Sequence, residues 1–294
     1  VTNTIIDVAF GKITKYTGSF SSAIKQKEVK KEVQLKAYEK QRRQIEQDEA
    51  YIRKNKAGTR STMAKSRQKR LDKMERVDPP SDALQSSFGF PYEELMSSST
   101  LVVDDLSVGY ERPLLAPVTF SMSHGEKVVL KGFNGVGKST LIKSILGIIP
   151  NFGGSAKFVE AAKVNYFTQD LDWDNPAQTP LQIVQNVYPK LEPKTIRQRL
   201  ARAGLSPANA MKPMELLSGG EQTKVKLCIL ELKPSNFLIM DEPTNHLDDE
   251  TKHALKKALM SFAGNLLLVS HEKSFYDGWI DKVFDVESIR LNKN

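Results

Sequence analysis

The sequence has 294 residues, 39% of them hydrophobic and 27% charged, and this length allows one large or two small domains with hydrophobic cores. Its longest apolar runs, such as residues 266–269, are far too short to cross a bilayer, so the composition excludes a membrane-spanning helix. Cys228 is the single cysteine, which excludes an internal disulfide and favours a reducing, cytoplasmic setting.

The positive charge is concentrated in one segment. The chain has a net charge of +8; residues 25–78 hold 18 Lys and Arg against nine Asp and Glu, whereas the remaining residues hold 25 against 26. A basic segment on an otherwise neutral chain favours a polyanionic partner, most often a nucleic acid.

Residues 1–20 contain two short stretches typical of strands, on either side of Gly11, and this pattern predicts a β-hairpin. The first residue, Val1, lies inside the first stretch, and the hairpin carries too little apolar material to fold alone. We therefore expect the chain to be part of a longer one, with residues 1–20 ending a preceding domain.

Residues 21–80 are expected to form an antiparallel helical hairpin. From Ser19 or Ser21, either of which could cap a helix, to Lys54 there is neither Pro nor Gly, and good helix formers dominate. A turn over residues 55–60 and a second helix from Ser61 to Val77 follow. The apolar positions are sparse, so the hairpin is expected to project into solvent or into a partner.

The tip of this hairpin is strongly basic. Ten Lys and Arg lie between Arg53 and Arg76, against Asp72 and Glu75 alone. The alternative is that the hairpin is only a solvated spacer. A spacer gains nothing from basic side chains that repel one another, whereas the phosphates of a nucleic acid would neutralise their charge. Few aromatic residues are interleaved, so base stacking is not the expected mode. The expected nucleic-acid contacts are Arg53, Lys54, Lys56, Arg60, Lys65, Arg67, Lys69 and Arg70.

Residues 81–100 are Ser-rich and are expected to be a connecting linker with one anchoring cluster over residues 88–92. From residue 101 the pattern is that of a compact α/β domain. Strands are predicted over residues 101–103, 118–122, 127–131, 163–168, 236–240, 265–270 and 283–286, and helices over 141–146, 247–262 and, with Pro breaks, 176–214.

A phosphate-binding loop is predicted between the strand at 127–131 and the following helix. Residues Gly132 to Thr140 fit the pattern G-x-x-x-x-G-K-[ST] at each fixed position. The glycines let backbone N–H groups surround a phosphate, and the helix N-terminus adds positive potential. Lys138 would reach the β- and γ-phosphates, and the Ser139 hydroxyl would bind Mg²⁺. An ordinary glycine-rich turn is the alternative.

Two further motifs follow, at Leu217 to Gln222 and at Phe237 to Asp248. With the phosphate loop they occur in the order of an ATP-binding cassette, and residues 101–294 resemble that superfamily. The run Asp-Glu-Pro-Thr-Asn-His-Leu-Asp at 241–248 resembles the ABC-F family, in which a helical hairpin joins two cassettes and there is no transmembrane domain. Many bacterial members bind the ribosome near its tRNA exit site, with the hairpin tip reaching toward the peptidyl-tRNA.

The resemblance implies an ATPase that uses ATP and Mg²⁺ and acts on translation through ribosomal RNA and tRNA. It implies a cassette at 101–294 with a mainly parallel sheet, an antiparallel β subdomain and a helical subdomain, after a remnant of a first cassette at 1–20. One phosphate loop and one signature motif cannot complete a site, so the expected partner is that first cassette or a second copy packed head to tail. The resemblance leaves three roles open: a translation factor, the rescue of stalled ribosomes and resistance to an antibiotic.

The resemblance also assigns roles to single residues. Glu242 is the expected general base, His271 holds the attacking water and Lys138 contacts the γ-phosphate. The expected nucleotide contacts are Tyr110, Gly132, Asn134, Gly135, Gly137, Lys138, Ser139, Thr140 and Gln169, together with Ser218, Gly219, Gly220 and Glu221 acting on the opposing cassette. The expected Mg²⁺ ligands are Ser139, Gln169 and, through water, Asp241. A packed surface aromatic is the alternative for Tyr110, and a core histidine for His271.

Three other functions compete. A transporter's nucleotide-binding subunit is disfavoured by the basic hairpin, and a DNA-repair ATPase by the short interval between phosphate loop and signature. A binding module without turnover is disfavoured by Glu242 and His271. Lys224, where many family members carry Arg, and Glu272-Lys273, where Asp-Arg is common, depart from the family pattern but retain the charge.

Overall fold

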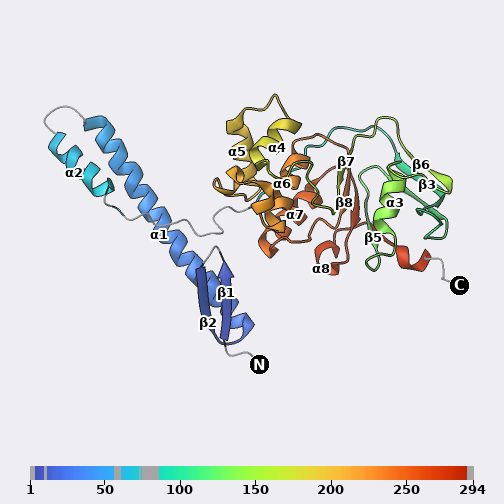
Figure 1. Ribbon diagram of the computed structural model, residues 1–294, viewed down its shortest axis with the longest axis horizontal. Helices are drawn as coiled ribbons and strands as arrows, with labels where there is room; N and C mark the ends of the chain where they lie inside the picture. The colour runs from blue at the N-terminus through green and yellow to red at the C-terminus, as the bar shows by residue number, and fades with distance from the viewer. Residues whose placement is uncertain (1–3, 10–11, 56–60, 73, 75–85, 290–294) are drawn as a thin grey trace. The chain divides into compact units, whose positions relative to one another are not determined.

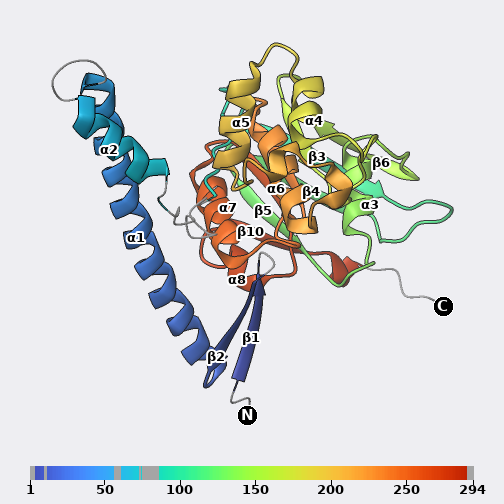
Figure 2. The same ribbon diagram turned by 60° about the vertical axis from the view of Figure 1, so that its left-hand side comes forward.

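The computed structural model describes residues 4–9, 12–55, 61–72, 74 and 86–289. The chain divides into two compact units, residues Val1–Ala83 and Leu84–Asn294. Both are drawn in Figure 1 and, turned by 60°, in Figure 2. No helix among the described residues is both long enough and apolar enough to cross a membrane.

The first unit begins with the predicted β-hairpin. Strand β1 (Thr4–Ala9) pairs antiparallel with β2 (Lys12–Thr17), and Ile5 lies opposite Tyr16. Helix α1 (Phe20–Asn55) follows directly, within a residue or two of the predicted bounds. The amide of Gln26 donates to the Thr17 carbonyl at 2.8 Å, so the first turns of α1 are tied to the end of β2.

Helix α2 (Ser61–Asp72) is shorter than predicted. The predicted end at Val77 lies outside the described residues, but Met74 is not helical, and its amide bonds to the Leu71 carbonyl at 3.2 Å, which closes a tight turn instead of continuing the helix. The carboxylate of Asp72 in the last turn is unfavourable there because the helix C-terminus carries negative potential.

A buried carboxylate holds the two helices of the hairpin together. Asp48 of α1 is fully buried and accepts a hydrogen bond from Arg67 of α2 at 2.8 Å and another from Arg70. The guanidinium of Arg67 also lies over the ring of Tyr51, 4.1 Å from its centroid. The bond from Arg70 holds the pKa of Asp48 below its ordinary value, with help from the charge of Arg67 and against the effect of burial.

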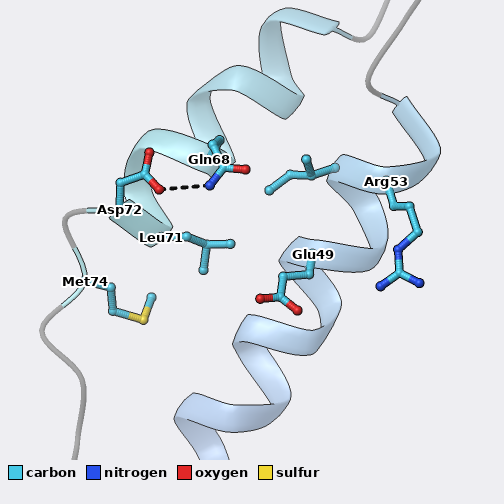
Figure 3. A pocket seen from close by; sticks show the side chains of 7 residues that line it. Glu49, Arg53, Gln68, Leu71, Asp72 and Met74 are labelled. Carbon is cyan, nitrogen blue, oxygen red and sulfur yellow. Dashed lines mark hydrogen bonds between the residues drawn. The ribbon is translucent and has the colours of Figure 1, made fainter.

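A groove of about 660 Å³ lies between the same helices, on a seam of Ile52, Leu71 and Met74. Its polar rim is formed by Glu49, Arg53, Gln68 and Asp72. Figure 3 shows the bond from Gln68 to Asp72, at 2.9 Å, and shows Arg53 extending away from α2. The seam is thin, as predicted, because few apolar side chains line it.

The second unit contains two sheets. Strands β10 (Lys282–Asp285), β5 (Lys127–Lys131), β9 (Asn265–Val269), β8 (Phe237–Asp241) and β7 (Val164–Phe167) form a parallel sheet in that order, and β4 (Val118–Ser123), β3 (Ser99–Ser107) and β6 (Gly153–Phe158) form an antiparallel one. The predicted α/β fold is therefore confirmed. Strand β6 was not predicted, because its first residues, Gly153-Gly154-Ser155, have low strand propensity and it is held by pairing with β3.

The described part of this unit also contains six α-helices. They are α3 (Lys138–Ile145), α4 (Pro180–Val187), α5 (Pro193–Arg202), α6 (Gly219–Glu231), α7 (Asp249–Ser261) and α8 (Lys273–Tyr276), with 3-10 turns at Asn209–Met211, Met214–Leu216 and Val286–Ile289. Figure 1 shows α4, α5 and α6 gathered on the side of the parallel sheet away from β3 and β6. The helix predicted from Leu247 starts at Asp249 because Asp248 caps it, accepting from the Thr251 amide at 2.7 Å.

Two hydrophobic cores support this unit. One lies between the sheets and includes Leu130 and Leu141, whereas the other lies among α4, α5, α6 and α7 and includes Leu200. Phe88 and Phe90, from the predicted anchoring cluster, are buried in the second core.

We predict that Asp48→Asn loosens the hairpin. Losing the charge weakens both bonds to arginine, so the amides of α2 should exchange with deuterium about tenfold faster at pH 7. A depressed pKa stabilises the fold above the unfolded-state value of about 4 and loses that effect as pH falls below it, so the difference should shrink at pH 3. Hydrogen exchange followed by mass spectrometry of residues 61–72 measures this.

Glu46→Gln is the matched control, because Glu46 pairs with Arg42 on the exposed face of α1, where ion pairs contribute little. Equal exchange rates in all three proteins at pH 7 would contradict the role given to Asp48.

Candidate nucleotide-binding site

The predicted phosphate loop lies between β5 and α3. Gly135 and Gly137 have φ angles of +80° and +113°, a left-handed region that glycine adopts readily. A Cβ on Gly135 would meet no atom within 4 Å, so the backbone conformation and not the available space requires glycine there. Gly137 caps α3, whose first N–H groups have no partners inside the helix and are free to bind an anion.

Lys138 is buried at the start of α3, and its ammonium group crosses the loop. It donates to the carbonyls of Gly132 at 2.6 Å and Phe133 at 3.0 Å. It also lies 4.0 Å from Oε1 of Glu242. The same cation therefore faces the loop that would hold a phosphate and the carboxylate predicted to act on water.

Two buried carboxylates follow one another at the end of β8. Burial raises the pKa of Asp241, and a hydrogen bond from Ser139 of the phosphate loop opposes this. Glu242 is 4% exposed, has a φ of +50°, and donates its backbone amide to the Val269 carbonyl at 3.0 Å. Such a φ is rare outside glycine, and the neighbouring strand β9 holds it.

His271 follows β9 and stands beside Glu242. Its Nδ1 lies 2.8 Å from Oε2 of Glu242, and its side chain is 49% exposed. The histidine therefore has one side against a buried carboxylate and the other open to a ligand. This disfavours the alternative of a core histidine.

The oxygens at this edge of the sheet fit a hydrated metal ion. Oδ1 of Asp241 and both carboxylate oxygens of Glu242 are buried, yet accept no hydrogen bond in the described part of the chain. Buried oxygens of this kind need a donor, such as metal-bound water. Among the described residues, no group of three or more His, Cys, Asp or Glu is arranged so that it could hold a metal ion by itself. The donor set therefore fits Mg²⁺ held by a hydroxyl, an amide and phosphate oxygens.

The remaining residues expected on this side of a nucleotide are mostly accessible. Tyr110, between β3 and β4, is 63% exposed, and Asn134 and Gln169 are exposed as well. Gly132 and Ser139 are partly buried, and Thr140 is buried. The exposure of Tyr110 disfavours the alternative in which it is an aromatic residue packed on the protein surface.

The signature motif forms the N-terminus of α6. Ser218 caps this helix, and its hydroxyl donates to Glu221 at 2.9 Å. A Cβ on Gly220 would lie 2.4 Å from the carbonyl oxygen of His246, whose φ is +65°. Close packing against His246 therefore requires glycine at position 220. Within the described part of the chain, no hydrogen bond or ion pair joins Ser218, Gly219 or Gly220 to the phosphate loop.

The basic residues expected to contact nucleic acid divide into three groups. Arg53, Lys54, Lys65 and Lys69 are exposed. Arg67 and Arg70 bond to Asp48 and so hold the hairpin together. Lys56 and Arg60 lie outside the described residues.

Sequence reasoning missed Lys226 of α6, whose ammonium group contacts the segment after β7. The available sequence signal was a lysine placed between two apolar residues, Val225 and Leu227. The structure shows that both of these neighbours are buried.

Comparison with known proteins agrees with this fold. Two family models, both described as ABC transporter, match residues 6–90 and 115–245; the first is an extension model of that family. A solved structure, a putative ABC transporter ATP-binding protein from Pyrococcus furiosus, has a TM-score of 0.56 and 21% identity and covers 65% of this chain and 100% of its own. At that identity it supports the fold alone.

Two curated relatives match nearly the whole chain. The uncharacterized ABC transporter ATP-binding protein YfmM of Bacillus subtilis is 37% identical over 98% of this chain and 56% of its own length. ABC transporter F family member 2 of Arabidopsis thaliana is 31% identical over 96% of this chain and 42% of its own. The chain spans about half the length of such relatives. It belongs to the ABC-F type of ATP-binding cassette proteins.

Proposed function

We propose that the chain hydrolyses ATP with Glu242 as the general base. The observation that carries this proposal is the buried Glu242 carboxylate, which has His271 at 2.8 Å and Lys138 at 4.0 Å. In this arrangement a carboxylate that accepts no other hydrogen bond faces the residues that would hold the γ-phosphate.

The phosphate loop and Lys138 would hold the triphosphate, and Tyr110 would stack on the adenine. Glu242 accepts a proton from water as the water oxygen bonds to the γ-phosphorus and the bond to the β-phosphate oxygen breaks. His271 keeps that water in line. Ser139, Gln169 and Asp241 would hold Mg²⁺, which neutralises charge on the phosphate oxygens.

We propose that the site is completed by another cassette, either a further one in a longer chain or a second copy. Ser218 and the free amides that follow it at the start of α6 would bind the γ-phosphate held by that cassette, where the helix N-terminus favours an anion.

We further propose that the α1–α2 hairpin binds ribosomal RNA or tRNA, so that the protein acts on translation. Support comes from the excess of positive charge in residues 25–78 and from the exposure of Arg53, Lys54, Lys65 and Lys69.

The family models and the Bacillus relative carry the word transporter in their descriptions, which makes a transporter subunit the second candidate.

We predict that Glu242→Gln lowers the rate of ATP turnover at least about 100-fold, because the amide cannot accept the proton from water. Binding of ATP should stay within about twofold of the unchanged protein, since the phosphate loop and Lys138 are intact. A phosphate-release assay and a fluorescent ATP analogue measure the two quantities. Glu215→Gln, an exposed change on the turn before the signature, is the control. Turnover by Glu242→Gln within a few-fold of normal would remove Glu242 as the base.

We predict that replacing Lys54, Lys65 and Lys69 with Gln weakens binding of the Glu242→Gln protein to ribosomes in the presence of ATP. Three lost phosphate contacts should reduce the slope of log affinity against log salt by about 2 to 3. Co-sedimentation between 50 and 200 mM salt, in ATP and in ADP, gives the slope.

The matched control replaces Lys25, Lys36 and Lys40, three exposed lysines nearer the start of α1, with Gln and makes the same change in net charge. An equal loss of binding in both triple variants would mean that only bulk charge matters. Absence of ribosome binding in either nucleotide would reject the ribosomal partner and leave the ATPase standing.

A further inference from the structure

The segment after β7 is wrapped around one ammonium group. Lys226 of α6 donates to the Thr168 carbonyl at 2.9 Å, to the Thr168 hydroxyl and to the Asp170 carbonyl. An ammonium has three N–H donors, and these three acceptors use all of them. The residue between the two bonded carbonyls is Gln169.

The surroundings of Lys226 make these bonds strong. The residue is partly buried, and its ammonium also lies 5.4 Å from the ring centroid of Phe167. Burial lowers the pKa of Lys226, and the charges of Asp170, Asp172 and Asp241 oppose this. A charge-assisted hydrogen bond in a partly desolvated position is stronger than one between neutral groups. The backbone on both sides of Gln169 is therefore fixed, while the Gln169 side chain stays exposed.

A second contact ties the same segment to the same helix. The indole nitrogen of Trp173 donates to Gln222 at 2.9 Å, and Gln222 in turn donates to the Leu217 carbonyl at 3.1 Å. Ser218 caps α6, and Lys226 lies eight residues further along, about 12 Å at the helical rise. One rigid helix thus carries the signature serine at its start and the anchor of the Gln169 segment two turns later.

We propose that Lys226 is a positioning residue for Mg²⁺ and ATP: its ammonium fixes the Thr168–Asp170 backbone so that Gln169 meets the metal on the phosphates. The proposal rests on the proposed role of Gln169 as a Mg²⁺ ligand. Because α6 supplies the anchor, the position of Gln169 follows the position of the helix that also bears Ser218.

Lys226→Met tests this, because methionine keeps most of the unbranched side chain and removes the three donors. Fluorescent N-methylanthraniloyl-ATP is bound to the whole chain while MgCl₂ is titrated, and the half-saturating Mg²⁺ concentration is measured. Lys226→Met should raise the half-saturating Mg²⁺ concentration about tenfold, because losing a residue that orients a metal ligand typically weakens metal binding by that much or more. Binding of the analogue in EDTA should be unchanged.

Gln169→Ala should raise the half-saturating Mg²⁺ concentration similarly, and the double variant should be no worse than either single one because both act through one ligand. Lys226→Arg should recover part of the loss, since it restores charged donors. Thr168→Val removes one acceptor with little change of shape and should give a shift of about threefold, which keeps the test valid if Lys226→Met fails to fold. Lys233→Met, an exposed lysine just after α6, is the matched control.

The outcomes separate the two proposals. A shift with Gln169→Ala but none with Lys226→Met or Thr168→Val overturns the role of Lys226 and leaves Gln169 as a ligand. A shift with Lys226→Met but none with Gln169→Ala shows that Lys226 only supports the fold and removes Gln169 from the metal site. Additive shifts in the double variant also overturn the proposal, because the two residues would then act independently.

Discussion

The parallel alignment of four neighbouring strands determines where the phosphate loop, Gln169, Glu242 and His271 lie. Strands β5, β9, β8 and β7 are adjacent and parallel, so the segments that leave their carboxyl ends meet at one edge of the sheet. The phosphate loop leaves β5, His271 follows β9, Glu242 follows β8 and Gln169 follows β7. Each strand therefore contributes one part of the candidate site, and the register of Asp241 opposite Val269 brings Glu242 beside His271.

The sheet edge maintains an arrangement that would be unfavourable in isolation. Glu242 combines a positive φ with a buried carboxylate whose close polar neighbours among the described side chains are His271 and Lys138, and each of these features costs stability. The fully buried strands β8 and β9 supply the packing that offsets this cost. In its proposed role as general base, Glu242 would gain from the same features, because few competing donors surround it and the low dielectric strengthens its interaction with Lys138 and His271.

Sequence predicted the parts of this chain whose determinants are local. The phosphate loop, the buried strand before Asp241 and the uninterrupted α1 each depend on residues close together in the chain. Strand β6 was missed because β3, some fifty residues earlier, holds it in place. Lys226 was missed for the same reason, since its acceptors Thr168 and Asp170 lie more than fifty residues away.

The hairpin shows how a local pattern can mislead about single residues. Ten basic residues near the tip form one composition signal, and nothing in that signal separates Arg67 and Arg70 from their neighbours. Their distinct role comes from Asp48, which lies 19 and 22 residues earlier on the other helix. The exposed Arg53, Lys54, Lys65 and Lys69 are left as the described residues of the tip best suited to a polyanion.

The central claim is that this cassette holds ATP on its own phosphate loop and needs the signature serine of another cassette for turnover. The most direct test measures ATP turnover by the 294-residue chain over a range of protein concentrations. If a second copy supplies Ser218, the rate at low concentration should rise about fourfold for each doubling of the chain, by mass action. A robust rate that is strictly proportional to chain concentration where the chain is monomeric would contradict the account, because a single copy would then be sufficient.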